Sequence, residues 1–184
     1  MPELRMHAER TPNPESVKWV LGRAIVPDGG CATFGPEVDA GISPLAAILL
    51  AVEGVERILL GSDFVTITKS SEVAWSELAG PVPAAIRAWA VSDEPALGPA
   101  WAPPEAIEDD AVVARIRRIL DLEIAPYVAQ DGGEIALEGF DDGVVRVRLR
   151  GACEGCPSST ITLKMGIEAR LREEIPEVQS VEAV

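Results

Sequence analysis

The sequence VVRVRLRGACEGCPSSTITLKMGIEARL, residues 144–171, decides the fold of the second half of the chain. Apolar residues alternate with arginine from Val144 to Arg150, which is typical of a strand with one buried face. From about Ser158 to Glu174, apolar residues recur every three or four positions, which indicates an amphipathic helix. Cys153 and Cys156 lie between these two elements. The stretch therefore predicts a strand and a helix joined by a turn that carries a C-x-x-C pair.

The residues on either side of this stretch complete a small domain. A helix is expected from about Asp109 to Tyr127, because acids stand in its first turn and apolar residues follow at helical spacing. A strand over Glu134 to Gly139 should pair with the Val144 strand across the turn 141–143, Asp-Asp-Gly. The alternation from Val178 to Val184 indicates a third strand.

The first half of the chain shows the same mixture of elements. Ser16 to Leu21 alternates as a half-buried strand does, and Ser43-Pro44 is an N-cap followed by a proline at the first helical position. Two further strands, Val55 to Leu60 and Phe64 to Lys69, are expected to form a hairpin. A last helix, Pro81 to Val91, should bury Ile86 and Trp89.

A segment rich in proline and acids separates the two halves. Residues 92–108 contain four prolines and four acids and no basic residue, a composition typical of a linker. We therefore predict an α+β fold made of two small α/β sandwich domains joined by a Pro-rich acidic linker. The predicted boundaries are 1–92 for the first domain, 93–108 for the linker and 109–184 for the second domain.

Charge and composition exclude several functions. The formal net charge of −14 opposes binding to nucleic acid and to anionic membranes. The longest apolar run is about half of what a membrane span needs, and the first residues do not resemble a signal or transit peptide, so a cytoplasmic location is expected. No catalytic constellation is visible, and the single histidine offers no general base, so we predict that the chain is not an enzyme and has no catalytic residues.

The C-x-x-C pair carries the chemistry. A tight turn brings two thiols at this spacing to one side, and Gly151 and Gly155 give the backbone the freedom that such a turn needs. The start of the following helix favours thiolates and an anionic group bound to them, and Arg150 adds positive charge. Such a pair can hold zinc or an iron–sulfur cluster, or can form a redox-active disulfide.

Counting the ligands separates these alternatives. A four-thiolate site needs two more ligands, but the other candidates in the chain are Cys31 in the first domain and His7 near the N-terminus. One chain therefore supplies half a site. Two chains related by a twofold axis would supply four cysteines, which predicts a homodimer bridged by a cluster on Cys153 and Cys156.

The second half contains a set of short motifs: Ala125-Pro126, Asp131-Gly132-Gly133, residues 149–159 (LRGACEGCPSS), Thr162-Leu163 and residues 175–178 (IPEV). Through these motifs, residues 116–184 resemble the C-terminal domain of NifU, the Nfu-type iron–sulfur scaffold. The first domain is similar to the Nfu N-terminal domain through residues 11–14 (TPNP), 43–46 (SPLA), 53–55 (EGV) and 64–69 (FVTITK). The segment 28–31, which contains Cys31, is not part of that pattern.

The resemblance implies an iron–sulfur cluster carrier. Cys153 and Cys156 of two subunits would hold one [4Fe-4S] cluster, received from upstream cluster-assembly proteins and delivered to apo iron–sulfur client proteins. A [2Fe-2S] cluster also accepts four thiolates and stays open. The runner-up is a dithiol-disulfide oxidoreductase that uses the same pair, and a third reading is a structural zinc shared by two chains.

Other conspicuous residues have simpler explanations. Cys31 is expected to pack as a small hydrophobic residue, and His7 to be exposed. The arginines at positions 146, 148 and 150 should form a solvated strand face rather than a docking surface for acidic partners. The tryptophans at positions 19, 75 and 89 are expected in the core or at its boundary.

Overall fold

The computed structural model describes residues 5–27, 30–92, 94–102, 110–153 and 157–184, with the backbone alone for 157–160. The chain divides into two compact units, residues 1–103 and 104–184. Each unit contains helices and a β-sheet and has its own apolar core, which confirms the predicted α+β class.

A five-stranded antiparallel sheet forms the centre of the first unit. The strand order is β1-β2-β5-β4-β3. β5 is the central strand, and it forms a hairpin with its neighbour β4. The strands are β1 (His7–Arg10), β2 (Ser16–Val20), β3 (Ala32–Phe34), β4 (Val55–Leu60) and β5 (Phe64–Lys69).

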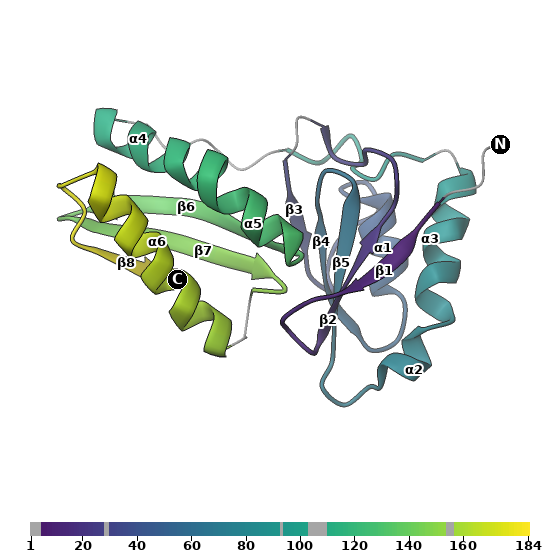
Figure 1. Ribbon diagram of the computed structural model, residues 1–184. Helices are drawn as coiled ribbons and strands as arrows, with labels where there is room; N and C mark the ends of the chain where they lie inside the picture. The colour runs from purple at the N-terminus through teal and green to yellow at the C-terminus, as the bar shows by residue number, and fades with distance from the viewer. Residues whose placement is uncertain (1–4, 28–29, 93, 103–109, 154–156) are drawn as a thin grey trace. The chain divides into compact units, whose positions relative to one another are not determined.

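Helices cover one face of this sheet (Figure 1). They are α1 (Pro44–Leu50), α2 (Trp75–Leu78) and α3 (Pro81–Ser92). Ser43 caps α1 as predicted, because its Oγ accepts a hydrogen bond from the backbone N–H of Ala46 at 3.1 Å. Ile86 and Trp89 of α3 are buried in the core, which confirms their expected positions.

Three elements of the first unit escaped the sequence analysis. β1 is short and polar, and it has no pattern that marks a strand. It is a strand because it pairs with β2 at the edge of the sheet. β3 has three residues, too few for an alternation to be recognised. The one-turn helix α2 begins at Trp75 after Ala74, a residue that is not a typical N-cap.

The segment 94–102 packs on the first unit. The Ser43 hydroxyl donates a hydrogen bond to the Ala96 carbonyl at 2.7 Å, and the Gly98 N–H donates to the Ile42 carbonyl at 2.8 Å. Ala96 is buried in the core. This part of the predicted linker therefore belongs to the compact body of residues 1–103, whereas residues 103–109 lie outside the described residues.

A three-stranded sheet with the order β6-β7-β8 forms the second unit, from β6 (Gly133–Asp141), β7 (Val144–Gly151) and β8 (Ser180–Ala183). β6 and β7 form an antiparallel hairpin, and Asp142 and Gly143 at its turn both have a positive φ, of 48° and 81°. This is the backbone that an Asp-Gly pair adopts readily in a two-residue hairpin turn. β8 pairs parallel with β7, so the predicted third strand is confirmed.

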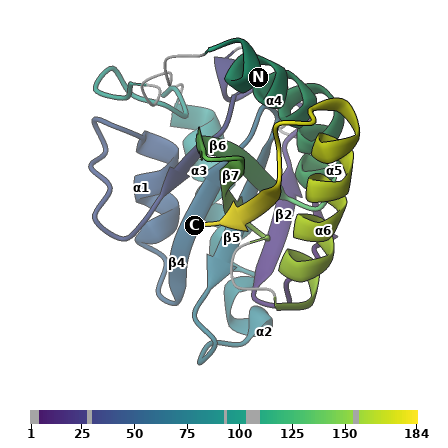
Figure 2. The same cartoon turned by 90° about the vertical axis from the view of Figure 1, so that its left-hand side faces the viewer.

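The helices of the second unit lie on one side of its sheet (Figure 2). The predicted helix from Asp109 to Tyr127 is a continuous run of three helical segments, α4 (Ala111–Ile119), the π-helical turn η2 (Leu120–Ile124) and α5 (Ala125–Gln130). A proline removes a backbone donor and collides with the preceding turn, so Pro126 at the start of α5 explains why the ladder widens in η2.

The last helix of the second unit is α6 (Pro157–Glu174), which connects β7 to β8. Ile167 and Leu171 of this helix are buried against Val145 and Val147 of β7 in one core, as the sequence predicted. The order β7, turn, α6 places the C-x-x-C segment between the end of a central strand and the first residue of a helix.

Candidate metal centre

Cys153 lies immediately beyond the end of β7, at the edge of the apolar core of the second unit. Gly151, the last residue of β7, has φ +65°, a backbone conformation that favours glycine, and it turns the chain away from the sheet. Cys153 is 8% exposed and belongs to the same cluster as Val128 of α5 and Leu149 of β7. The thiol is thus held by packing, with a small part of its surface open.

The Gly132-Gly133 turn forms the wall beside this thiol. The Ala152 N–H donates a hydrogen bond to the Gly132 carbonyl at 3.2 Å, and Gly132 has φ +75°. A Cβ atom on Gly133 would overlap with the Sγ of Cys153 and would lie 3.1 Å from the side chain of Val128. The sulfur therefore occupies the space that a side chain at position 133 would fill.

Cys156, the second predicted ligand, lies outside the described residues together with Glu154 and Gly155. The backbone of α6 begins one residue later, at Pro157. The first N–H groups of a helix have no partner within it and carry a partial positive charge, which favours thiolates near that end. The helix thus begins at the expected place in the sequence, and its effect on the two thiols stays a prediction.

Arg150 carries less free charge than the sequence suggested. Its guanidinium lies 3.5 Å from a carboxylate oxygen of Glu134 on β6, and both side chains are mostly buried. The two residues are directly opposite each other in the β6–β7 register. Because the charge of Arg150 is balanced by this carboxylate, its contribution to a thiolate is smaller than that of an unpaired arginine.

The whole arginine row of β7 is paired in this way. Arg146 lies 3.8 Å from Asp141, and Arg148 lies 3.2 Å from Glu138. The row is thus a ladder of ion pairs across the hairpin, with Arg146 and Arg148 partly exposed. This arrangement supports the solvated strand face over a docking surface for acidic partners.

The remaining candidate ligands are placed elsewhere. Cys31 is a half-buried residue of the first unit, and the ring of His7 is exposed and lies 3.1 Å from a carboxylate oxygen of Glu9. Within the described part of the chain, no three His, Cys, Asp or Glu side chains lie close enough together to hold a metal ion. Among the described residues, Cys153 is thus not part of a set of three possible ligands.

The site can hold a soft metal or cluster at the edge of a protein core, where thiolates are the preferred ligands. A thiol packed against a glycine and a helix that begins four residues later in the chain fit such a group. The spacing of the cysteines predicts their role, whereas the contact of Gly133 with Cys153 has no comparable signal in the sequence. The Gly-Gly pair was its only signal, and only the fold brings it beside a cysteine twenty positions away.

The fold and the site define a class of protein: a two-unit α+β chain that presents a cysteine pair between a strand and a helix. Two family models match the chain. The model described as "Scaffold protein Nfu/NifU N terminal" matches residues 6–93, and the "NifU-like domain" model matches residues 116–182. The chain belongs to the Nfu family of iron–sulfur cluster scaffold proteins.

Curated relatives agree with this assignment. A protein of Drosophila sechellia named "NFU1 iron-sulfur cluster scaffold homolog, mitochondrial" is 41% identical over 97% of this chain and 64% of its own length. The Homo sapiens protein of the same name is 40% identical over 97% of this chain and 71% of its own length. The chain thus spans less than two thirds of the Drosophila protein.

Among solved structures, a NifU-like protein from Saccharomyces cerevisiae matches 54% of this chain and 88% of its own, at 21% identity and a TM-score of 0.46. Across the described residues, no helix is long and apolar enough to cross a membrane.

Proposed function

We propose that this chain is a carrier of iron–sulfur clusters that holds its cargo on Cys153 and Cys156 of two subunits. The observation that carries the proposal is the position of Cys153, packed against the Gly132-Gly133 turn and followed by a helix that begins at Pro157. Because Gly133 has no side chain, the Sγ of Cys153 fits beside it, and a side chain at position 133 would take the place of this sulfur.

The number of ligands supports the dimer. An iron–sulfur cluster takes four thiolates, and the C-x-x-C pair of one chain supplies two of them. Two copies related by a twofold axis supply the other two. The cluster would then lie at the contact between subunits, which is an accessible place for transfer.

The cargo is a [4Fe-4S] cluster, with a [2Fe-2S] cluster as the alternative that the same four ligands accept. Upstream cluster-assembly proteins would load the carrier, and apo iron–sulfur proteins would receive the cluster. In this role residues 109–184 form the cluster-binding domain, and residues 1–92, together with the segment 94–102 that packs on them, form the Nfu N-terminal-like domain.

The proposal assigns no enzymatic activity and a cytoplasmic location. The names of the Drosophila and human relatives place those proteins in mitochondria. Fractionation of the source cells with an antibody against the chain would test the location.

Anaerobic reconstitution with iron and sulfide tests the function. The unmodified chain should become brown, bind about four irons per pair of chains and run as a dimer. Cys153→Ser and Cys156→Ser should each lose the colour and the dimer. Cys31→Ser is the matched control and should bind as much iron as the unmodified chain.

The same experiment separates the alternatives. A colourless dimer that contains zinc would replace the carrier with a shared structural zinc. A colourless monomer that reduces disulfides catalytically would replace it with the oxidoreductase. In the oxidoreductase either Cys153 or Cys156 would attack the disulfide of another protein, and because Cys153 is mostly buried, attack by this thiol would require it to be uncovered.

A further inference from the structure

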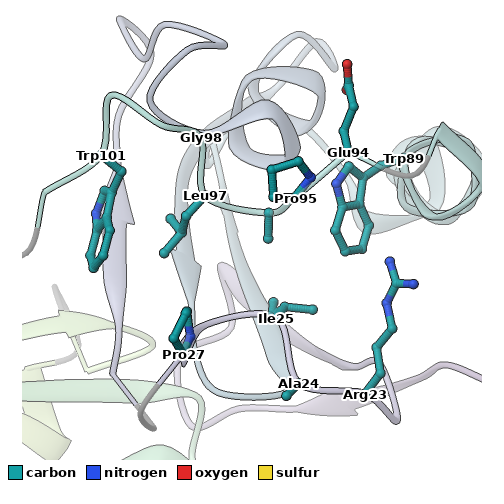
Figure 3. A pocket seen from close by; sticks show the side chains of 11 residues that line it. Arg23, Ala24, Ile25, Pro27, Trp89, Glu94, Pro95, Leu97, Gly98 and Trp101 are labelled. Carbon is teal, nitrogen blue, oxygen red and sulfur yellow. The ribbon is translucent and has the colours of Figure 1, made fainter.

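The first unit contains a pocket that the cluster chemistry does not use. It has a volume of about 520 Å³, within the range of small-ligand sites, and lies between the loop 23–27, helix α3 and the segment 94–101 (Figure 3). Ile25, Leu97 and Trp101 form apolar parts of its wall.

One polar group in the wall has no hydrogen-bond partner among the described residues. Trp89 of α3 is 2% exposed, and its Nε1–H meets no hydrogen-bond acceptor among the described residues. Figure 3 shows the nitrogen-bearing edge of this ring turned toward Pro95, on the pocket side of α3. Buried donors are nearly always satisfied, so an orphan donor in a pocket wall indicates that an acceptor binds there.

A cation lies beside this donor. The guanidinium of Arg23 stacks on the Trp89 ring, 4.5 Å from its centroid, and Arg23 forms no ion pair with the described residues. Guanidinium groups recognise carboxylates through hydrogen bonds that charge strengthens.

Glu94, the acidic residue among the described residues that line the pocket, faces elsewhere. Glu94 is exposed, and Figure 3 shows its carboxylate pointing away from Arg23 and from the Trp89 ring. The Arg23 side of the pocket therefore favours an anion. The other walls favour an apolar body.

We propose that this pocket binds the carboxylate end of an apolar ligand, with Arg23 and the Trp89 indole N–H as donors and Ile25, Leu97 and Trp101 around the apolar part. The C-terminal residue of a polypeptide and a free carboxylic acid share this chemistry. The inference is independent of the cluster site, because it involves only residues of the first unit.

The four tryptophans make the test direct. Each gives one indole N–H signal in a ¹H–¹⁵N spectrum of the full chain, and Trp89→Phe assigns the signal of Trp89. Trp19 is the matched control: its buried Nε1–H also has no acceptor among the described residues, but Trp19 does not line this pocket. A ligand in the pocket should move the Trp89 signal and leave the Trp19 signal in place.

Two pairs of probes test the carboxylate and its source. The free acid 4-phenylbutyrate is compared with its amide, and the peptide Ala-Ala-Ala-Leu with a free C-terminus is compared with the same peptide amidated. At least one acid should give a saturable shift of the Trp89 signal with a Kd of about 1 mM or tighter, and its amide should not. Saturation by the peptide alone identifies a polypeptide end as the ligand, and saturation by phenylbutyrate alone identifies a free acid.

Variants complete the test. Arg23→Gln should weaken binding of the acid at least tenfold, whereas Arg87→Gln, an exposed arginine of α3 outside the pocket, should leave it unchanged. Unshifted signals of Trp19 and Trp75 in each variant show that the first unit remains folded. Equal shifts with acid and amide, no shift with either acid, or full binding by Arg23→Gln would each overturn the proposal.

Discussion

Gly133 lies so close to Cys153 that the Sγ of the cysteine occupies the place of a side chain at position 133. The two residues are on neighbouring strand ends of the second unit, and the hydrogen bond from the Ala152 N–H to the Gly132 carbonyl holds the two segments together. The position of the proposed cluster ligand thus depends on a residue without a side chain.

Gly133→Ala should therefore displace the thiol of Cys153. The added methyl group collides with the sulfur and crowds Val128, and overpacking of this kind costs about 1–3 kcal/mol of unfolding free energy. We expect less iron per chain after reconstitution and a lower urea midpoint by circular dichroism. Gly139→Ala, on the same strand with nothing within 4 Å of the new methyl group, is the control. Equal iron content in both variants would contradict the role of Gly133.

Removing the hydroxyl of Ser43 should weaken the first unit. This buried Oγ accepts from the Ala46 N–H and donates to the Ala96 carbonyl, so Ser43→Ala removes both a helix cap and the bond to the segment 94–102. A loss of about 1–3 kcal/mol is expected. Because all four tryptophans lie in residues 1–103, their fluorescence reports urea unfolding of this unit. The exposed Ser71→Ala is the control, and an equal midpoint for both variants would refute the prediction.

The hairpin turn of the second unit should not tolerate a side chain at position 143. Gly143 has φ +81°, and a Cβ atom there would lie 2.8 Å from the side chain of Gln179. Gly143→Ala should cost about 1–2 kcal/mol from the backbone alone. Gly166→Ala, at an open position within α6, should instead stabilise the unit by about 0.5–1 kcal/mol. Circular dichroism during urea unfolding compares the two, and changes of the same sign would contradict the reasoning.

Stability near pH 4 should respond to the ion pair between Glu123 and Arg170. The Arg170 guanidinium donates to both carboxylate oxygens of Glu123, at 2.7 and 3.2 Å, and these bonds hold the pKa of Glu123 below its ordinary value of 4.5. Since the pKa is lower in the folded chain than in the unfolded chain, the pair stabilises the fold above pH 4.5. That contribution is lost as the pH falls through the folded-state pKa.

Glu123→Gln should thus lower the urea midpoint slightly at pH 7, and the difference from the unmodified chain should disappear in acid below the folded-state pKa. The effect is small because the pair lies at the surface, where both side chains are partly exposed and solvent screens their attraction. Glu177→Gln, an exposed acid beyond the end of α6, should show no difference at either pH. A difference for Glu123→Gln that persists unchanged in acid would exclude the ion pair as its cause.

Local signals explain how much of the fold could be predicted. Ser43-Pro44 and Asp142-Gly143 each specify a backbone geometry within four residues. The alternation in β7 marks a buried face, and the turn between two strand-like runs marks the β4–β5 hairpin. Those elements were found at nearly their observed bounds. β1 and β3 could not be found, because their residues form strands through pairing with β2 and β4 rather than through any pattern of their own.

At the candidate site, too, features set by neighbouring residues could be predicted, and features set by strand pairing could not. Cys153 and Cys156 were recognised from their spacing, which is a property of neighbouring residues. The wall made by Gly133 and the ion pair between Arg150 and Glu134 depend on the β6–β7 register, so sequence reasoning did not assign them. From the sequence alone Arg150 was expected to add positive charge near the cysteines, but in the fold Glu134 balances this charge.

The attachment of the segment 94–102 decides where the chain can be cut to obtain the first unit as a folded fragment. The Gly98 N–H and the Ala100 N–H bind the carbonyls of Ile42 and Gly41, and Ala96 fills part of the core. A cut after residue 92, where prolines and acids begin, would expose that core and remove one side of the pocket around Trp89. A stable fragment must therefore end at or after residue 102, so the autonomous folding unit is about a tenth longer than its regular helices and strands.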